Sequence, residues 1–206
     1  MQRRELLVPV FANWLVIPAI VALLFGQFIS PAGASNLLSF GKSTKRVEMT
    51  AKNPTVEMDT NKGVIRIEIF QEEAPRTSKN FLDLVERGFY NGIVFHRYEP
   101  GFCVQGGDPR GNGTGGFIDP ATGRERTIPL EVTPKLRHSE AGMVAMARSN
   151  DPNSASSQFY FTLGPASFLD GQYAVFGKVI DGLNVVKELR KGDKMNKVFV
   201  LSEAHK

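Results

Sequence analysis

From residue 54 onward the chain is a succession of short apolar stretches, each interrupted by glycine, proline or asparagine. In the stretch 64–70, isoleucine at every second position alternates with charged residues, which is the pattern of a strand with one buried face. Many short strands with turn residues between them favour a β-sandwich or a β-barrel. We expect strands at 56–60, 64–70, 93–98, 102–105, 142–147, 158–163, 174–179 and 197–201.

Two segments among these strands have the character of helices. The first runs from Pro75 to Arg87, with proline near its start and Gly88 just past its end. The second is shorter and runs from Leu183 to Arg190. Closure of a barrel removes exposed strand edges but leaves its two ends open, so two helices are natural covers for those ends.

The N-terminal segment differs from the rest of the chain. No charged residue occurs from Leu6 to Gly41, and the most apolar part, 15–29, has the length of a signal-peptide core. Ala32-Gly33-Ala34 then matches the pattern at which a signal peptidase cleaves. The alternative is an uncleaved membrane anchor over residues 6–29.

We therefore divide the chain into a signal peptide or membrane anchor at 1–34, a polar linker at 35–53 and a folded domain at 54–206. With either form of the N-terminal segment, the folded domain is predicted to be exported, to a periplasm or a thylakoid lumen. Contact with a membrane is expected only through the N-terminal segment.

Composition and motifs exclude several kinds of function. A single cysteine, Cys103, rules out a disulfide within the chain and a cysteine-built zinc site. The formal charge of +4 is too small to indicate nucleic-acid binding. The three histidines lack the spacing of metal ligands, and His138 is expected in a surface loop. Residues 111–116 satisfy G-x-G-x-x-G, yet Pro120 argues against the helix that a nucleotide site needs, so a glycine loop on the rim of a cleft is predicted.

The most informative polar residue lies within residues 95–108. Pro100-Gly101 fits a tight turn between two strands, because proline fixes φ and glycine is free to take a positive φ. On the first strand, alternation places Arg97 on the opposite face from its two neighbours. Two later segments, 157–161 and 168–177, add aromatic side chains and an amide. A groove that grips apolar side chains and peptide backbone is therefore expected near Arg97.

Seven motifs occur in order along the folded part of the chain: Phe95-His96-Arg97, Pro100-Gly101-Phe102, Gln105-Gly106-Gly107-Asp108, Gly113-Thr114-Gly115-Gly116, Ser157-Gln158-Phe159, Leu169-Asp170-Gly171 and Val175-Phe176-Gly177-Lys178-Val179. Because all seven fall in family order, residues 55–202 clearly resemble the cyclophilins. The resemblance implies a mainly β fold, an eight-stranded antiparallel closed β-barrel capped by two α-helices, and proline isomerase activity without a cofactor. Residues 145–148 and 89–92 resemble the bacterial branch.

The resemblance also implies roles for individual residues. Arg97 matches the catalytic arginine and Gln105 the glutamine beside it. As the bond before proline twists, the prolyl nitrogen gains a lone pair, to which Arg97 is expected to donate a hydrogen bond that stabilises the transition state. The positions that match the pocket for the substrate proline are Phe102, Tyr160 and Leu169, and those that match the groove for the flanking peptide are Ala147 and Gln158.

Five positions of the substrate site depart from the common family pattern. They are Cys103 for methionine, Arg148 for asparagine, Tyr160 for phenylalanine, Phe168 for tryptophan and Tyr173 for histidine. Tyr160 adds a hydroxyl to the floor of the proline pocket, so reduced or altered activity is expected. Phe168 predicts weaker cyclosporin binding than in eukaryotic relatives.

Two functions remain open at this point. The first is a monomeric peptidyl-prolyl cis–trans isomerase that acts on proline-containing segments of exported proteins and assists their folding. The alternative is a weakly active or inactive cyclophilin-fold chaperone or assembly factor that binds such segments. Arg97 and Gln105 favour the enzyme, because a pure binder has no need of that pair.

Overall fold

A computed structural model describes residues 53–201 of the chain, so the predicted signal peptide or anchor and nearly all of the predicted linker lie outside the described residues. Within residues 53–201, no helix is both long and apolar enough to cross a membrane. The elements are β1 (Thr55–Thr60), β2 (Gly63–Ile69), α1 (Pro75–Glu86), β3 (Arg97–Glu99), β4 (Cys103–Gly106), β5 (Ile118–Asp119), β6 (Arg124–Glu125), β7 (Met143–Met146), β8 (Phe159–Thr162), a short 3-10 helix (Ser167–Leu169), β9 (Val175–Asp181), α2 (Leu183–Glu188) and β10 (Met195–Leu201).

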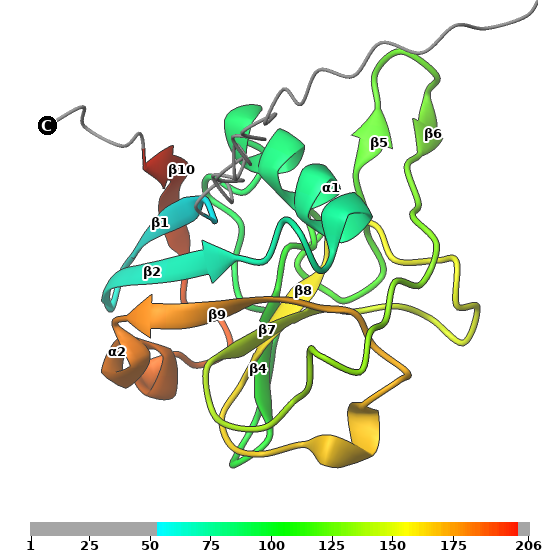
Figure 1. Cartoon of the computed structure of the whole chain (residues 1–206). Helices are drawn as coiled ribbons and strands as arrows, with labels where there is room; N and C mark the ends of the chain where they lie inside the picture. Colours follow the sequence, from blue (N-terminus) through cyan, green and yellow to red (C-terminus); the bar gives the residue numbers. More distant parts are fainter. Residues whose placement is uncertain (1–52, 202–206) are drawn as a thin grey trace, which may run out of the picture. The chain divides into compact units, whose positions relative to one another are not determined.

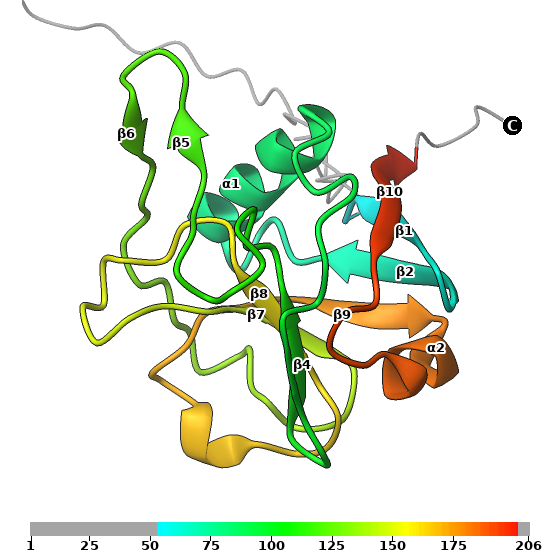
Figure 2. The ribbon, with the colours of Figure 1, turned by 180° about the vertical axis from the view of Figure 1, so that it is seen from behind.

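Eight of the strands form one antiparallel sheet, in the order β10-β1-β2-β9-β7-β8-β4-β3. The sheet curls so that α1 covers one of its ends and α2 packs against β2 near the other (Figures 1 and 2). The mainly β fold and the two predicted helices are therefore confirmed. The helix α1 ends at Glu86, one residue before its predicted end, and Gly88 lies just past it with a φ of 67°, as predicted.

The predicted closed barrel is wrong, because the two edge strands, β3 and β10, form no ladder with each other. The segments that precede these strands meet only at an isolated bridge between Val94 and Lys194, beside a few backbone hydrogen bonds such as that from Phe95 N to Asp193 O, 2.8 Å. Gly92 and Gly192 have φ values of 84° and 96°, so left-handed backbone interrupts both segments and prevents a continuous pair of strands there. The sheet is thus an open half-barrel.

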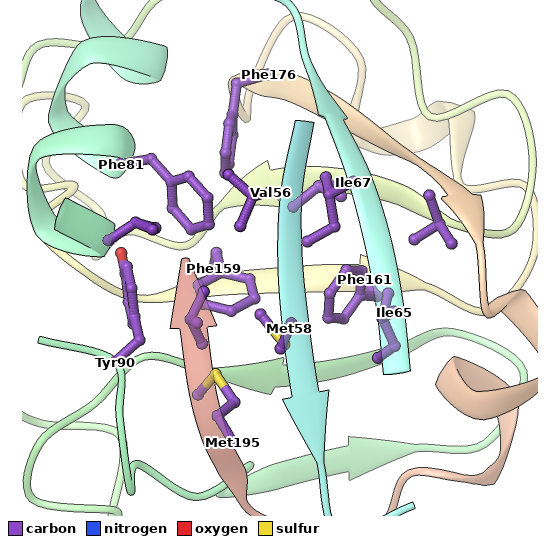
Figure 3. Close-up of a cluster of buried hydrophobic side chains, with 14 of the residues drawn as sticks. Val56, Met58, Ile65, Ile67, Phe81, Tyr90, Phe159, Phe161, Phe176 and Met195 are labelled. Atoms are coloured by element: carbon purple, nitrogen blue, oxygen red, sulfur yellow. The ribbon is translucent and has the colours of Figure 1, made fainter. Parts of the chain in front are cut away.

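The core fills the inside of this curled sheet (Figure 3). The isoleucines of β2 are fully buried, as the alternation predicts. Phe81 of α1 lies at the centre of an aromatic group, with its ring centroid 5.2 Å from Tyr90, 5.4 Å from Phe159 and 5.0 Å from Phe176. Such contacts fix the strands that carry the site, because close-packed aromatic rings leave little room for movement.

The sequence did not predict the hairpin of β5 and β6, which projects from the sheet (Figure 1). Each of its strands has only two residues, and Pro120 and Gly123 in the turn conceal any alternation. The predicted strand 93–98 is also shorter than expected, because only Arg97–Glu99 forms a ladder.

Candidate functional site

Three neighbouring strands bring polar side chains into one row across the sheet. Arg97 of β3 pairs with Gln105 of β4, and Gln105 pairs with Tyr160 of β8. Alternation along β8 turns Phe159 and Phe161 into the main core and Tyr160 to the opposite face, where a second and smaller apolar cluster lies. The core and the candidate site therefore occupy the two faces of the same strands.

The row opens into a pocket of about 320 Å³. Nine of the eleven predicted site residues line it, although the sequence spreads them over more than seventy positions. The structure thus brings these residues together, while their roles in binding and catalysis stay predictions. The lining residues are Arg97, Phe102, Cys103, Gln105, Ala147, Arg148, Tyr160, Leu169 and Tyr173.

The guanidinium of Arg97 is held at this pocket by groups on two strands. Its Nε lies 3.3 Å from Glu99 Oε1, and one terminal nitrogen donates to Gln105 Oε1 at 3.4 Å. Its Cζ lies 6.0 Å from the centre of the Phe102 ring, within reach of a cation–π interaction. With 47% of its side chain exposed, Arg97 keeps N–H groups available for a ligand.

Gln105 is itself oriented by Gln158, which links the arginine to the glycine loop. Gln105 Nε2 donates to Gln158 Oε1 at 2.9 Å. Gln158 Nε2 then donates to the carbonyl oxygens of Gly113, at 3.1 Å, and Gly115, at 2.8 Å. Both amides are therefore fixed in one orientation, so that Gln105 presents its oxygen to Arg97.

The glycine loop is fixed in turn by the buried carboxylate of Asp108. That carboxylate accepts backbone N–H groups from Arg110, Asn112 and Gly113. Burial disfavours ionisation of Asp108, but these hydrogen bonds outweigh it and lower the pKa of the carboxyl.

The loop borders a second pocket, of about 410 Å³, beside the first. Gly113 to Gly115 form part of its wall, which confirms the prediction of a glycine loop on the rim of a cleft. Gln158 lines this pocket rather than the first, and Gln105, Ala147 and Arg148 line both. The two pockets are therefore neighbours that share part of their lining.

Arg148 is one of the residues that line both pockets. Its Nε donates to Gln172 O at 2.9 Å and its terminal nitrogen to Ser149 O at 2.8 Å. Its Cζ lies 4.7 Å from the centre of the Tyr173 ring, so both departures from the family pattern pack on each other.

Phe168 lies outside both pockets, although the resemblance places it in the substrate site. It is 66% exposed, and its ring centroid lies 5.5 Å from that of Phe102. It therefore extends the aromatic wall beyond the pocket.

Cys103 is 2% exposed and lines the pocket next to Tyr160, as a small apolar wall residue would. Burial raises the pKa of its thiol, which keeps it protonated at neutral pH. Among residues 53–201, no three His, Cys, Asp or Glu side chains lie close enough together to hold a metal ion.

The prediction that His138 lies in a surface loop is wrong. It is completely buried, with Nδ1 3.0 Å from Asp170 Oδ1 and Nε2 2.8 Å from the hydroxyl of Tyr160. The physical reason is that a buried tyrosine hydroxyl requires a partner. The sequence did carry a signal, since Tyr160 stands where the family usually has phenylalanine, but nothing in it showed which residue would meet the hydroxyl.

Comparisons with known proteins agree with this architecture. A family model described as "Cyclophilin type peptidyl-prolyl cis-trans isomerase/CLD" matches residues 55–204. Peptidyl-prolyl cis-trans isomerase-like 1 from Rhizopus delemar is 44% identical over 150 residues, which cover 72% of this chain and 88% of the relative. Peptidyl-prolyl cis-trans isomerase CYP18-2 from Arabidopsis thaliana is 40% identical over 136 residues, which cover 66% of this chain and 80% of the relative.

Solved structures give the same result. A crystal structure of a cyclophilin-type peptidyl-prolyl cis-trans isomerase from Cryptosporidium parvum has a TM-score of 0.66 at 32% identity, covering 74% of this chain and 99% of that one. A second crystal structure of that protein, in the presence of the dipeptide Ala-Pro, has a TM-score of 0.65 at 33% identity, covering 72% and 99%.

A half-barrel with an arginine and aromatic side chains lining one pocket has thus been matched along nearly all of its length to one class of enzyme. The chain belongs to the cyclophilin-type peptidyl-prolyl cis–trans isomerases, and its activity is the isomerisation of peptide bonds that precede proline. The relatives named here come from a fungus, a plant and a protist, so they lend no support to the predicted bacterial affinity. The predicted N-terminal anchor lies outside the residues that the family model matches.

Proposed function

We propose that this isomerase acts on Xaa-Pro bonds of exported polypeptides and assists their folding, with Arg97 stabilising the twisted amide. The observation that carries the assignment of Arg97 is its place at the pocket, where Glu99 and Gln105 hold its guanidinium and leave N–H groups free. Rotation about an Xaa-Pro bond has a barrier of about 18–20 kcal/mol, because amide resonance must be broken.

Arginine suits this step because the reaction needs no covalent bond to the enzyme. In the twisted state the prolyl nitrogen becomes pyramidal and accepts a hydrogen bond that it cannot accept in the planar amide. A donor fixed beside it therefore binds the transition state better than the ground state. The guanidinium remains charged at any relevant pH, so the donor is always present.

The first pocket is proposed to seat the proline ring. Phe102, Tyr160 and Leu169 form an uncharged part of its lining, while Arg97 and Arg148 also line it. With the ring anchored there, the preceding carbonyl is free to rotate past Arg97. The second pocket, with Gln158 on its wall and Ala147 and Arg148 shared with the first, is proposed to take the flanking peptide.

Export of the enzyme is the part of the proposal that rests on sequence alone. Its support is the uncharged segment from Leu6 to Gly41 and the Ala32-Gly33-Ala34 pattern, which suit a cleaved signal or an anchor over 6–29. The proposed compartment is a periplasm or a thylakoid lumen, and the proposed state is a monomer that touches a membrane only through that segment. The bacterial affinity inferred from residues 145–148 and 89–92 belongs to the same proposal.

A second candidate is a binder with little turnover, such as a chaperone or assembly factor. The observation that favours it is Tyr160, whose hydroxyl departs from the usual phenylalanine at the pocket floor. The two candidates differ in rate but share the binding of proline-containing segments.

The test is the isomerisation rate of a short Xaa-Pro peptide with the full-length protein and its Arg97→Ala variant. We expect the wild type to accelerate the reaction and Arg97→Ala to lose most of that acceleration while still binding the peptide. A wild type that binds the peptide but is no faster than the blank would favour the binder. An Arg97→Ala variant as fast as the wild type would remove Arg97 from the mechanism.

A further inference from the structure

Three polar side chains form a continuous line behind the floor of the pocket. The hydroxyl of Tyr160 lies 2.8 Å from His138 Nε2, and His138 Nδ1 lies 3.0 Å from Asp170 Oδ1. Tyr160 is 5% exposed and His138 is completely buried. Arg137 closes the far end of the line, since its Nε donates to Asp170 Oδ2 at 3.1 Å.

When the imidazole of His138 is neutral, the chemistry of the three groups sets the direction of their hydrogen bonds. Burial disfavours ionisation of Asp170, but hydrogen bonds from the backbone and ring of His138, with the charge of Arg137, outweigh it and lower the pKa of the carboxyl. An ionised carboxylate only accepts, so His138 Nδ1 carries the hydrogen. In a neutral imidazole Nε2 is then an acceptor, and the Tyr160 O–H donates to it. Burial also raises the pKa of the Tyr160 hydroxyl, so it keeps this proton.

The same residues hold a second wall of the pocket. Asp170 directly follows Leu169, and its Oδ1 also accepts the backbone N–H of His138 at 2.8 Å. The backbone N–H of Ala166 in turn donates to His138 O at 2.8 Å. The segment that carries Leu169 is therefore tied to the main chain of His138 through hydrogen bonds that do not depend on the imidazole.

We propose that the His138 side chain is a positioning residue of the proline pocket, which takes up the hydroxyl of Tyr160 so that the substrate meets only the tyrosine ring. This inference rests on the proposed function, because it requires that the pocket lined by Tyr160 is the one that seats proline. The role of His138 explains how the pocket accommodates tyrosine in place of phenylalanine. The Tyr160 hydroxyl has a hydrogen-bond partner on the side away from the pocket, and the same hydrogen bond fixes the orientation of the ring.

Loss of the imidazole acceptor has a defined consequence. The Tyr160 hydroxyl is then a buried donor without a partner, which is costly, so the ring turns or water enters to satisfy it. Either change alters the floor against which a proline ring packs. The expected loss falls mainly on KM, because the floor contacts the ring in the ground state and the transition state alike.

The experiment is a double-mutant cycle in the full-length protein. His138→Leu removes the acceptor, and Tyr160→Phe removes the hydroxyl that needs it. We expect His138→Leu to lower kcat/KM about tenfold, or about 1.4 kcal/mol, when Tyr160 is present. In the Tyr160→Phe background the same substitution should change kcat/KM less than twofold, because no hydroxyl is left unsatisfied.

Two further variants separate positioning from general damage. His138→Gln keeps an acceptor and should lose less activity than His138→Leu. His138→Phe keeps a ring without an acceptor and should lose as much activity as His138→Leu. Thermal unfolding shows which variants fold. If His138→Leu does not fold, His138→Phe takes its place in the double-mutant cycle. Equal losses in the two backgrounds would show a merely structural role and overturn the proposal, as would an unimpaired His138→Leu.

Arg97→Ala and the wild type, measured beside the cycle, report on the proposed function itself. If the wild type binds a proline peptide without turnover, that function fails, and the same cycle measured as peptide Kd still decides the role of His138. If the wild type neither binds nor isomerises such peptides, both proposals are overturned. Activity that depends on Arg97, with equal losses in the two backgrounds, overturns the positioning role alone.

Discussion

Replacement of Arg97 by lysine tests whether the site needs a positive charge or a fixed fork of donors. In the wild type, Glu99 and Gln105 engage the guanidinium at 3.3 and 3.4 Å, and other N–H groups stay free for the proposed hydrogen bond to the prolyl nitrogen. A lysine ammonium is a point charge on a flexible stem, and it cannot keep both partners while reaching a third acceptor.

The magnitude follows from the one hydrogen bond that is gained as the amide twists. A hydrogen bond to a charged group is worth about 1.5–3 kcal/mol. At about 1.36 kcal/mol per decade, its loss lowers kcat by about 10- to 150-fold. The Kd for the peptide should hardly change, because this bond is absent in the planar ground state.

The assay is cis–trans exchange of an Xaa-Pro peptide followed by NMR, with the Kd taken from a titration of the same peptide. Arg66→Lys is the matched control, since Arg66 is an exposed strand arginine that also pairs with carboxylates, at 2.9 Å to Glu57 and 3.0 Å to Asp181, outside both pockets. It should stay within twofold of the wild type. If Arg97→Lys also stayed within threefold, a charge alone would suffice, and the argument from donor geometry would be refuted.

Four further predictions follow from the described residues. Gln158→Leu should lower kcat/KM about fivefold, because a neutral hydrogen bond worth about 1 kcal/mol no longer orients Gln105; an unchanged rate would show that Gln105 needs no support. Burial lowers the pKa of His96, so the unfolded chain takes up a proton below about pH 6.5 before the folded protein does. The free energy of unfolding should therefore fall between pH 7.5 and 5.5, and fall less in His96→Gln; equal slopes would contradict this. Cys103, a buried thiol with a raised pKa, should remain unmodified by hydrogen peroxide in mass spectrometry, and a sulfenic acid at this residue would show that the pocket opens. Cyclosporin should bind more weakly than to relatives with tryptophan at the position of Phe168, which a titration of the wild type against Phe168→Trp would test.

Local patterns allowed much of the fold to be predicted from the sequence. The alternation in β2 and the proline and glycine at the ends of α1 are signals that span only a few residues, and the structure follows them closely. The open seam between β3 and β10 was not predictable in this way. It depends on how segments about one hundred residues apart meet, and on glycines at 92 and 192 whose effect appears only when the two segments lie together.

The candidate site was predictable to the extent that the family pattern names positions. Nine of the predicted residues do share a pocket, whereas Phe168 lies just outside it, against Phe102, and Gln158 belongs to the neighbouring pocket. The residues that hold the site residues in place, such as Glu99, could not be predicted from the sequence. Glu99 is an ordinary charged residue in sequence, and its contact with Arg97 becomes evident only from the geometry of β3.

The position of Tyr160 shows why core and site cannot be treated separately in this enzyme. Its neighbours Phe159 and Phe161 are fully buried on the other face of β8, with their ring centroids 5.6 Å apart in an edge-to-face contact. Their packing in the core holds β8 in position, and the hydrogen bond to His138 fixes the orientation of the Tyr160 ring. A polar substitution at the pocket floor is thus accommodated by one buried partner behind the floor, while the packing that holds the strand stays apolar.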